Sequence, residues 1–148
     1  PPFDLLVASS GGSPLDIDLR QAHKGMENAC GALRKGGSLF YYAECGDGLG
    51  SGMLEDYLRR FASAAAMEEA LRSDFVGGHK ALWLARLGEC YDVYLVTRLD
   101  PFFVRRCGFR PVAPEEHRTR LGDLIRSQQP DRVGVMPNAS FTVPVCGS

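Results

Sequence analysis

Three side chains near the start of the chain have the types and the spacing to hold an organic acid. Gln21 and Lys24 are three residues apart, so on a helix they share one face and can converge on a single group. Arg20, four residues before Lys24, brings a second cation to the same surface. A carboxylate held there would gain charge-assisted hydrogen bonds worth about 1.5–3 kcal/mol each. A solvated basic helix face has the same spacing, and the residues alone leave both interpretations open.

The loop before these side chains has the residues of a tight, capped turn. Gly11 and Gly12 allow positive φ and a close approach of the backbone. Asp16 or Asp18 can cap the following helix by accepting hydrogen bonds from its free N–H groups. Capping does not account for the cations that follow, because a positive charge near a helix N-terminus opposes the macrodipole.

A second glycine-rich loop reads GDGLGSG over residues 46–52. Its glycines, among them Gly48 and Gly50, alternate with other residues and lack the spacing of a dinucleotide fingerprint or of a P-loop. Phosphate binding by backbone N–H groups is one interpretation of this loop. A mobile turn is the simpler one.

Other reactive side chains are weaker candidates. His79 begins a predicted helix, where it could donate to an anion or lie over a substrate, although a single surface histidine usually does neither. The polar surroundings of His117 predict a solvated helix face, and Trp83 fits a helix core. Cys45 ends a predicted strand, but a reactive thiol needs a base beside it, so a structural cysteine is favoured.

Apolar periodicity and punctuation by glycine and proline predict the elements that position these residues. Strands are predicted over 3–9, 37–45, 91–99 and 132–137. Helices are predicted over 18–33, where the KGG that follows Arg34 stops the run, and over 53–63, 66–73, 77–90 and 114–129, with a short helix or turn over 101–109. The tail after Asn138 is expected to be loosely structured.

Strands that alternate with helices predict an α/β fold, because parallel strands need crossover connections. We expect a three-layer, Rossmann-like, doubly wound and mostly parallel sheet of four to five strands, formed by residues 1–148 as a single domain. In such sheets ligands bind outside the carboxyl ends of the strands. Both glycine-rich loops fall at that edge.

Composition excludes several classes of partner. The 17 Lys and Arg residues nearly balance 18 Asp and Glu residues, so the chain lacks the basic surface of a nucleic-acid-binding protein. No apolar run approaches the roughly 20 residues that span a membrane. The five scattered cysteines lack the spacing of zinc ligands and indicate reduced thiols, hence a cytoplasmic location and no metal site. The opening Pro1-Pro2 is typical of a domain cut from a longer polypeptide.

Several segments together resemble the C-terminal domain of the nickel-pincer lactate racemase family. They are SSGGSPLDIDLRQAHKGMENA, KGGSLFYYAECGDGLGS and FVGGHKALWLARL, followed by VYLVT and VGVMP. The resemblance runs from about Leu6 to Pro137, and its first two segments are the most specific. It implies a two-domain enzyme that racemises or epimerises a 2-hydroxy acid by hydride transfer to a nickel pincer nucleotide, with histidines as acid and base.

The resemblance also implies roles for individual residues. The family pattern Tyr-Gln-x-x-Lys corresponds to RQAHK over residues 20–24, so Gln21 and Lys24 match residues that hold the substrate at the domain interface. Arg20 replaces the tyrosine, which implies a larger or more acidic 2-hydroxy acid than lactate. His79 lies in a segment where the lactate enzyme carries an aromatic residue, and it too implies a different substrate.

The family's cofactor-tethering lysine, nickel-binding histidine and acid/base histidines belong to its N-terminal domain, and nothing in these 148 residues matches them. The expected partner is therefore an N-terminal catalytic domain of the same polypeptide, which would bind the nickel pincer nucleotide. The chain alone is expected to hold no cofactor and to catalyse nothing. Two alternatives stay open: a non-catalytic module that binds a nucleotide or phosphate at its glycine-rich loops, and a structural or assembly domain with a degenerate site.

Overall fold

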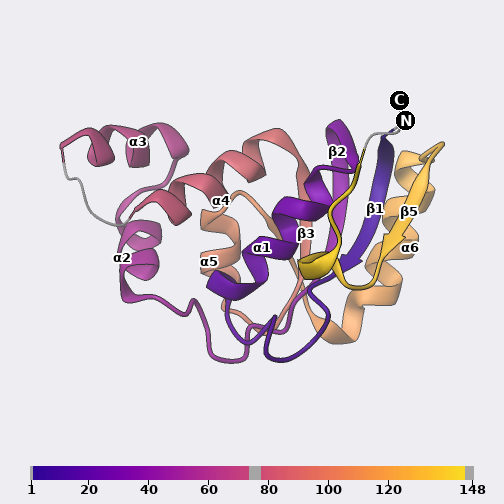
Figure 1. Cartoon of the computed structure of the whole chain (residues 1–148), viewed down its shortest axis with the longest axis horizontal. Helices are drawn as coiled ribbons and strands as arrows, with labels where there is room; N and C mark the ends of the chain where they lie inside the picture. The colour runs from indigo at the N-terminus through magenta and orange to yellow at the C-terminus, as the bar shows by residue number, and fades with distance from the viewer. Residues whose placement is uncertain (1, 74–77, 146–148) are drawn as a thin grey trace.

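The apolar runs of the sequence pair as one parallel sheet. The computed structural model describes residues 2–73 and 78–145; Pro1, Gly77 and Cys146, which enter the sequence interpretation, lie outside these ranges. The strands are β1 (Phe3–Ser9), β2 (Leu33–Tyr42), β3 (Asp92–Val96), β4 (Arg110–Val112) and β5 (Val133–Met136). All neighbours are parallel, in the order β4-β3-β2-β1-β5. Figure 1 labels β3, β2, β1 and β5 of this sheet. The predicted α/β fold with a doubly wound sheet is confirmed.

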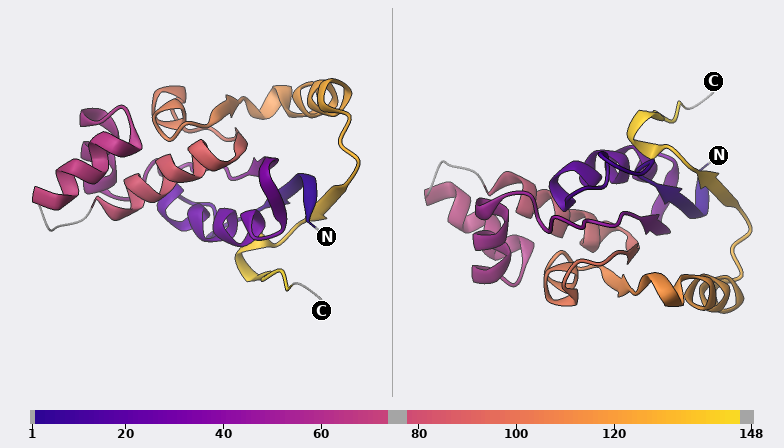
Figure 2. Two further views of the ribbon diagram at one scale, coloured as in Figure 1. Left: turned by 90° about the horizontal axis from the view of Figure 1, so that it is seen from above. Right: turned by 90° about the horizontal axis from the view of Figure 1, so that it is seen from below.

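Helices cover both faces of this sheet. In the described residues they are α1 (Leu19–Cys30), α2 (Gly52–Arg60), α3 (Ala64–Ser73), α4 (His79–Cys90), α5 (Pro101–Arg106) and α6 (His117–Gln128), with the short 3-10 helices η1 (Pro114–Glu116) and η2 (Ala139–Phe141). α1 and α6 lie on opposite sides of the sheet, which makes three layers (Figure 2). Within residues 2–73 and 78–145, no helix combines the length and apolarity needed to cross a membrane.

Two cores hold the layers together, because successive residues of a strand point to opposite faces. On one face Leu6 and Leu39 are buried against apolar residues of α1 and α4. On the other face Leu5 and Phe40 are buried with Leu124 of α6. The first core is much the larger, so α1 and α4, which carry most of the candidate site residues, are firmly anchored.

The boundary between the first helix and the second strand differs from the prediction. The predicted helix over 18–33 is too long and the strand over 37–45 starts too late, because α1 ends at Cys30 and β2 begins at Leu33. The register explains this: Phe3 pairs with Leu33 but Leu5 pairs with Ser38, so β2 bulges between them. Gly36, at φ 72°, supplies the positive φ that this bulge needs. The KGG sequence therefore bends a strand and does not end a helix.

The end of the chain is also more regular than expected. The segment after Asn138, predicted to be loosely structured, begins with η2, in which Ala139 is fully buried. Asn28 of α1 donates its Nδ2–H to the Ala139 carbonyl over 2.8 Å. The prediction of a loose tail is therefore wrong for η2, because α1 supplies a surface and a hydrogen bond that order it.

Candidate functional site

The loop after β1 lies at the point where the strand order reverses, between β1 and β5. Gly11, at φ 106°, packs against Asn138, which follows β5: a Cβ atom on Gly11 would lie 3.0 Å from the Asn138 side-chain oxygen. Gly12 and Asp16 line a pocket of about 330 Å³ at the same edge, together with Tyr42. The carboxyl edge thus gathers the glycines and the aspartate that the sequence singled out.

Asp18 caps α1. Its Oδ1 accepts a hydrogen bond from the Gln21 N–H over 2.7 Å, and its backbone is extended, as a capping residue requires. Asp16 does not cap the helix, since its carboxylate accepts from the Glu44 N–H over 3.4 Å. Of the two aspartates left open by the sequence, Asp18 is therefore the cap.

The second glycine-rich loop wraps around the start of α1. The N–H groups of Leu19 and Arg20 donate to the carbonyls of Gly48 and Leu49, over 3.0 and 3.2 Å. Gly50 is needed for this approach, because it has φ 72° and a Cβ there would lie 2.2 Å from the Asp18 carboxyl carbon. The free N–H groups at the start of the helix are thus satisfied within the chain.

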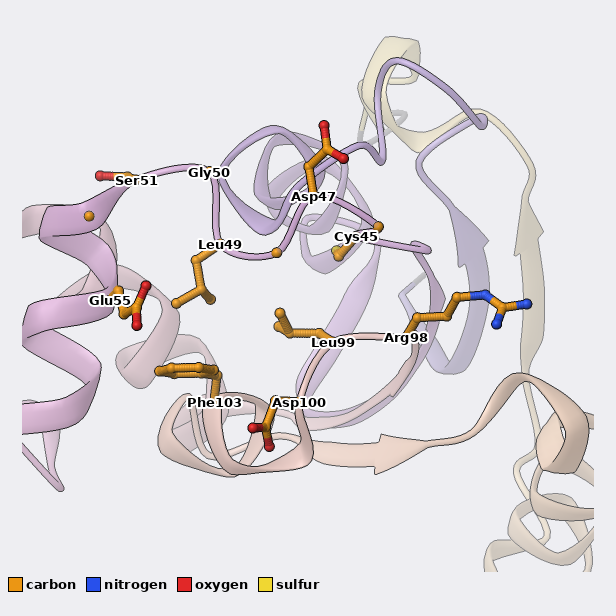
Figure 3. A pocket seen from close by; sticks show the side chains of 13 residues that line it. Cys45, Asp47, Leu49, Gly50, Ser51, Glu55, Arg98, Leu99, Asp100 and Phe103 are labelled. Atoms are coloured by element: carbon orange, nitrogen blue, oxygen red, sulfur yellow. The ribbon is translucent and has the colours of Figure 1, made fainter.

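This loop also borders a pocket of about 490 Å³ beside α2 and α5 (Figure 3). Three carboxylates line it, from Asp47, Glu55 and Asp100, around an apolar floor. The cation in its lining, Arg98, forms an ion pair with Glu44, with 3.0 Å between Nε and Oε1. Such a lining repels phosphate, which argues against a nucleotide site here.

Cys45 lies at the rim of this pocket but has no nucleophilic character. Its side chain is buried, and this burial raises the pKa of the thiol to about 12. The reactive form of a cysteine is the thiolate, so a neutral thiol at physiological pH is inert. The structural interpretation of Cys45 is therefore the better supported one.

The predicted acid-binding residues lie on the first turns of α1, beside the start of α4. Arg20 and Lys24 are exposed and Gln21 is half-buried. Lys80, near the start of α4, reaches to within 3.5 Å of the Arg20 carbonyl with its Nζ. His79, the first residue of α4, is exposed next to it. The fold thus brings the starts of two helices, far apart in sequence, to one surface.

A histidine and a tryptophan join these two helices. The His23 ring meets the Trp83 ring edge-on, with centroids 5.5 Å apart and an angle of 79° between planes. The Nδ1–H of His23 donates to the Arg20 carbonyl over 2.6 Å. Burial of the ring lowers the pKa of His23 below its ordinary value of 6.5, and Lys80 and Lys24 act in the same direction. His23 is therefore neutral at pH 7.

Sequence reasoning missed Lys80 and the pairing of His23 with Trp83. The interpretation of Trp83 as a core residue was incomplete, since its half-buried ring also packs on His23. His117 is no plain solvated residue either, because its Nδ1 lies 2.9 Å from the Tyr42 hydroxyl oxygen. No local pattern signals these pairs, which join residues at least 60 positions apart.

Comparisons with known proteins identify the family of the chain. The family model described as "Lactate racemase C-terminal domain" matches residues 1–138. The chain belongs to this family. Within the lactate racemase C-terminal domain family, it is 34% identical over 104 residues to the lactate racemase of Thermoanaerobacterium thermosaccharolyticum, covering 65% of this chain and 24% of that protein. It thus spans about a quarter of that relative's length.

A solved structure shows the same fold. The structure of the lactate racemase apoprotein from the same organism superposes with a TM-score of 0.79, at 24% sequence identity, over 98% of this chain and 36% of that one. The lactate racemase C-terminal domain therefore keeps its architecture while most of its residues differ. The resemblance read from the sequence is confirmed at the level of family and fold.

The described residues of this lactate racemase C-terminal domain contain no cluster of metal ligands. Across residues 2–73 and 78–145, no three His, Cys, Asp or Glu side chains gather into a set that could hold a metal ion. The described cysteines are also dispersed, with Cys30, Cys45 and Cys107 buried and Cys90 exposed. The described part of the chain thus offers cations and amides for a ligand, and no ligand set for a metal.

Proposed function

We propose that this domain contacts the substrate of a racemase or epimerase that acts on a 2-hydroxy acid. Gln21 donates a hydrogen bond to the substrate carboxylate, and Lys24 supplies the positive charge. The observation that carries the proposal is the position of both residues on the first turns of α1, at a surface where cations collect. Family membership supports it independently.

The start of α1 is rigid enough to serve as half of a binding site. Asp18 and the carbonyls of Gly48 and Leu49 satisfy its free N–H groups, and His23 packs on Trp83 of α4. A rigid surface loses little entropy when it meets a ligand. The domain therefore acts as a lid that closes over the substrate, excludes water and carries its binding groups into place.

The reacting groups belong to another domain of the same polypeptide in this proposal. A nickel pincer nucleotide, the cofactor implied by the resemblance, would accept and return the hydride there. The resemblance assigns the residues that would hold this group, a tethering lysine and a nickel-binding histidine, to that other domain, and no motif of residues 1–148 matches them. We therefore assign this domain substrate binding and closure, and no step of the chemistry.

Arg20 sets the preference among 2-hydroxy acids. Its side chain is exposed next to Gln21, in the position where the family pattern has tyrosine. A guanidinium favours an acidic or polar substituent on the substrate over the methyl group of lactate. His79, exposed at the start of α4, extends the same polar surface.

The nucleotide-binding alternative has less support. The N–H groups of Asp47 and Gly48 donate to the carbonyls of Ile17 and Cys45, both over 2.9 Å, and so do not face a phosphate. The neighbouring pocket is acidic. The other alternative, a structural domain with a degenerate site, gives no ligand for the cations of α1.

The racemase that contains this domain, loaded with its cofactor, provides the test. In a chiral assay with a panel of 2-hydroxy acids, Lys24→Gln is expected to raise KM at least about tenfold, because a charge-assisted hydrogen bond is lost. Lys35→Gln removes the same charge from an exposed position in β2 and is the matched control. An unchanged KM in Lys24→Gln overturns the carboxylate role, and a wild-type enzyme that racemises no 2-hydroxy acid overturns the function.

A further inference from the structure

A third cation joins the surface of α1 through tertiary contact alone. Lys80 comes from α4, yet its Nζ lies 3.5 Å from the carbonyl of Arg20. Desolvation lowers the pKa of Lys80, and the charges of Arg20 and Lys24 lower it further. Lys80 therefore lies within range of the charges of Arg20 and Lys24, which share one face of α1 at positions four apart.

No carboxylate of the described residues forms an ion pair with Arg20, Lys24 or Lys80, all their N–O distances exceeding 4.0 Å. Asp18 acts to raise the pKa of Lys80, and Glu27 acts to raise that of His23. Asp18 is nevertheless occupied as the cap of α1 and packed against Gly50. Within residues 2–73 and 78–145, these three cations thus have no ion-pair partner, which leaves them available to an anionic ligand.

From this arrangement we infer that Arg20 and Lys80 form a second anion-binding point, so that the substrate is a 2-hydroxy acid with two acidic groups. The inference rests on the proposed function, in which Gln21 and Lys24 bind the carboxylate beside the reacting carbon. Arg20 and Lys80 then bind the second acid group at the other end of a short molecule. Lys80 is a specificity-determining residue in this scheme.

Two points of attachment suit a dicarboxylic acid better than a monocarboxylic one. A single carboxylate satisfies one ammonium and one amide, and leaves the charges of Arg20 and Lys80 without a counterion among the described residues. The two helices cannot simply move apart to reduce the repulsion, because His23 and Trp83 hold them together. A second carboxylate neutralises the remaining charge and adds hydrogen bonds to charged donors.

Titrations of the 148-residue chain, followed by 1H–15N NMR, test the inference. The probes are lactate, 2-hydroxysuccinate and sulfate at equal ionic strength, with the wild type and Lys24→Gln, Lys80→Gln, Lys80→Arg and Lys35→Gln variants. We expect 2-hydroxysuccinate to bind about tenfold more tightly than lactate, with shifts at the starts of α1 and α4. Lys80→Gln should abolish this difference while the affinity for lactate is kept; Lys80→Arg should restore it.

The other outcomes separate the two proposals. If lactate and 2-hydroxysuccinate bind equally, and only Lys24→Gln weakens them, the second anion point is wrong and the proposed function stands. If sulfate binds as tightly as 2-hydroxysuccinate, the surface attracts any dianion and the assigned ligand class is wrong. If neither organic acid shifts the resonances of α1, the second anion point is wrong, whereas the proposed function is decided separately by the KM of Lys24→Gln in the whole racemase.

Discussion

His23 packs edge-on against Trp83, and this pair joins the two helices that carry the candidate acid-binding residues. The His23 ring also donates to the Arg20 carbonyl, the same atom that Lys80 approaches. The positions of Arg20 and Lys80 relative to each other therefore depend on a contact between two rings that touch neither the substrate nor, in this scheme, the cofactor.

Trp83→Ala is expected to lower the free energy of unfolding by about 2 kcal/mol, because a half-buried ring loses its packing on His23 and on the core. Urea denaturation followed by circular dichroism measures this. Trp83→Phe keeps an aromatic face and should cost less than half as much. Equal stability of Trp83→Ala and the wild type would show that the ring pair does not hold α1 on α4.

Stability should fall as the pH drops below about 6.5. The pKa of His23 is lowered in the folded chain, so below about pH 6.5 the unfolded chain binds more protons than the folded one. Acid therefore lowers the free energy of unfolding. Protonation would also place a fourth positive charge beside Lys24 and Lys80. Denaturation at pH 7.5 and 5.5 should show the loss in the wild type and a smaller loss in His23→Gln. His79→Gln, at an exposed position, should keep the wild-type dependence; if it instead shares the flatter response, the effect does not come from His23.

Gly50→Ala should destabilise the chain by at least about 2 kcal/mol. The residue has φ 72°, and the added Cβ would overlap the Asp18 carboxylate that caps α1. Gly46→Ala in the same loop meets nothing within 4 Å and serves as the matched control. Thermal unfolding compares the two, and similar melting temperatures would contradict the close approach of this loop to α1.

Thiol labelling should single out one of the described cysteines. Cys90 is exposed, whereas Cys30, Cys45 and Cys107 are buried and each has a pKa raised to about 12. In a Cys146→Ser background, we expect Ellman's reagent to modify Cys90 rapidly and the other three only on unfolding. Rapid labelling that persists in Cys90→Ser would show that a buried thiol is reactive.

Local sequence patterns were enough to predict the first strand, and they limited the cap of α1 to Asp16 or Asp18. The apolar run over Phe3–Ser9 coincides with β1, and Asp18 precedes an amphipathic helix at the position where a cap belongs. The family, too, was evident from motifs that lie on these loops and helices. Patterns of this kind involve residues that are close together in the sequence, so they can be recognised without a structure.

Other features depend on partners that the sequence does not place. Gly36 could be interpreted as a helix stop because its role in the bulge of β2 appears only once β1 pairs beside it. β4, at three residues, is too short for a periodicity and exists through its pairing with β3. Lys80 is remote from Arg20 along the chain, and only the packing of α4 on α1 makes it part of the candidate site.

The backbone of Arg20 takes part in hydrogen bonds that hold the fold, while its side chain is exposed at the surface. Its N–H donates to the Leu49 carbonyl, and its own carbonyl accepts from His23 and lies near Lys80. None of these contacts depends on what the side chain is, and the guanidinium itself is exposed. The residue at position 20 can therefore be exchanged at almost no cost in folding. If it sets the preferred acid as proposed, position 20 is the first place to look for divergence among related domains and the first to vary in redesign.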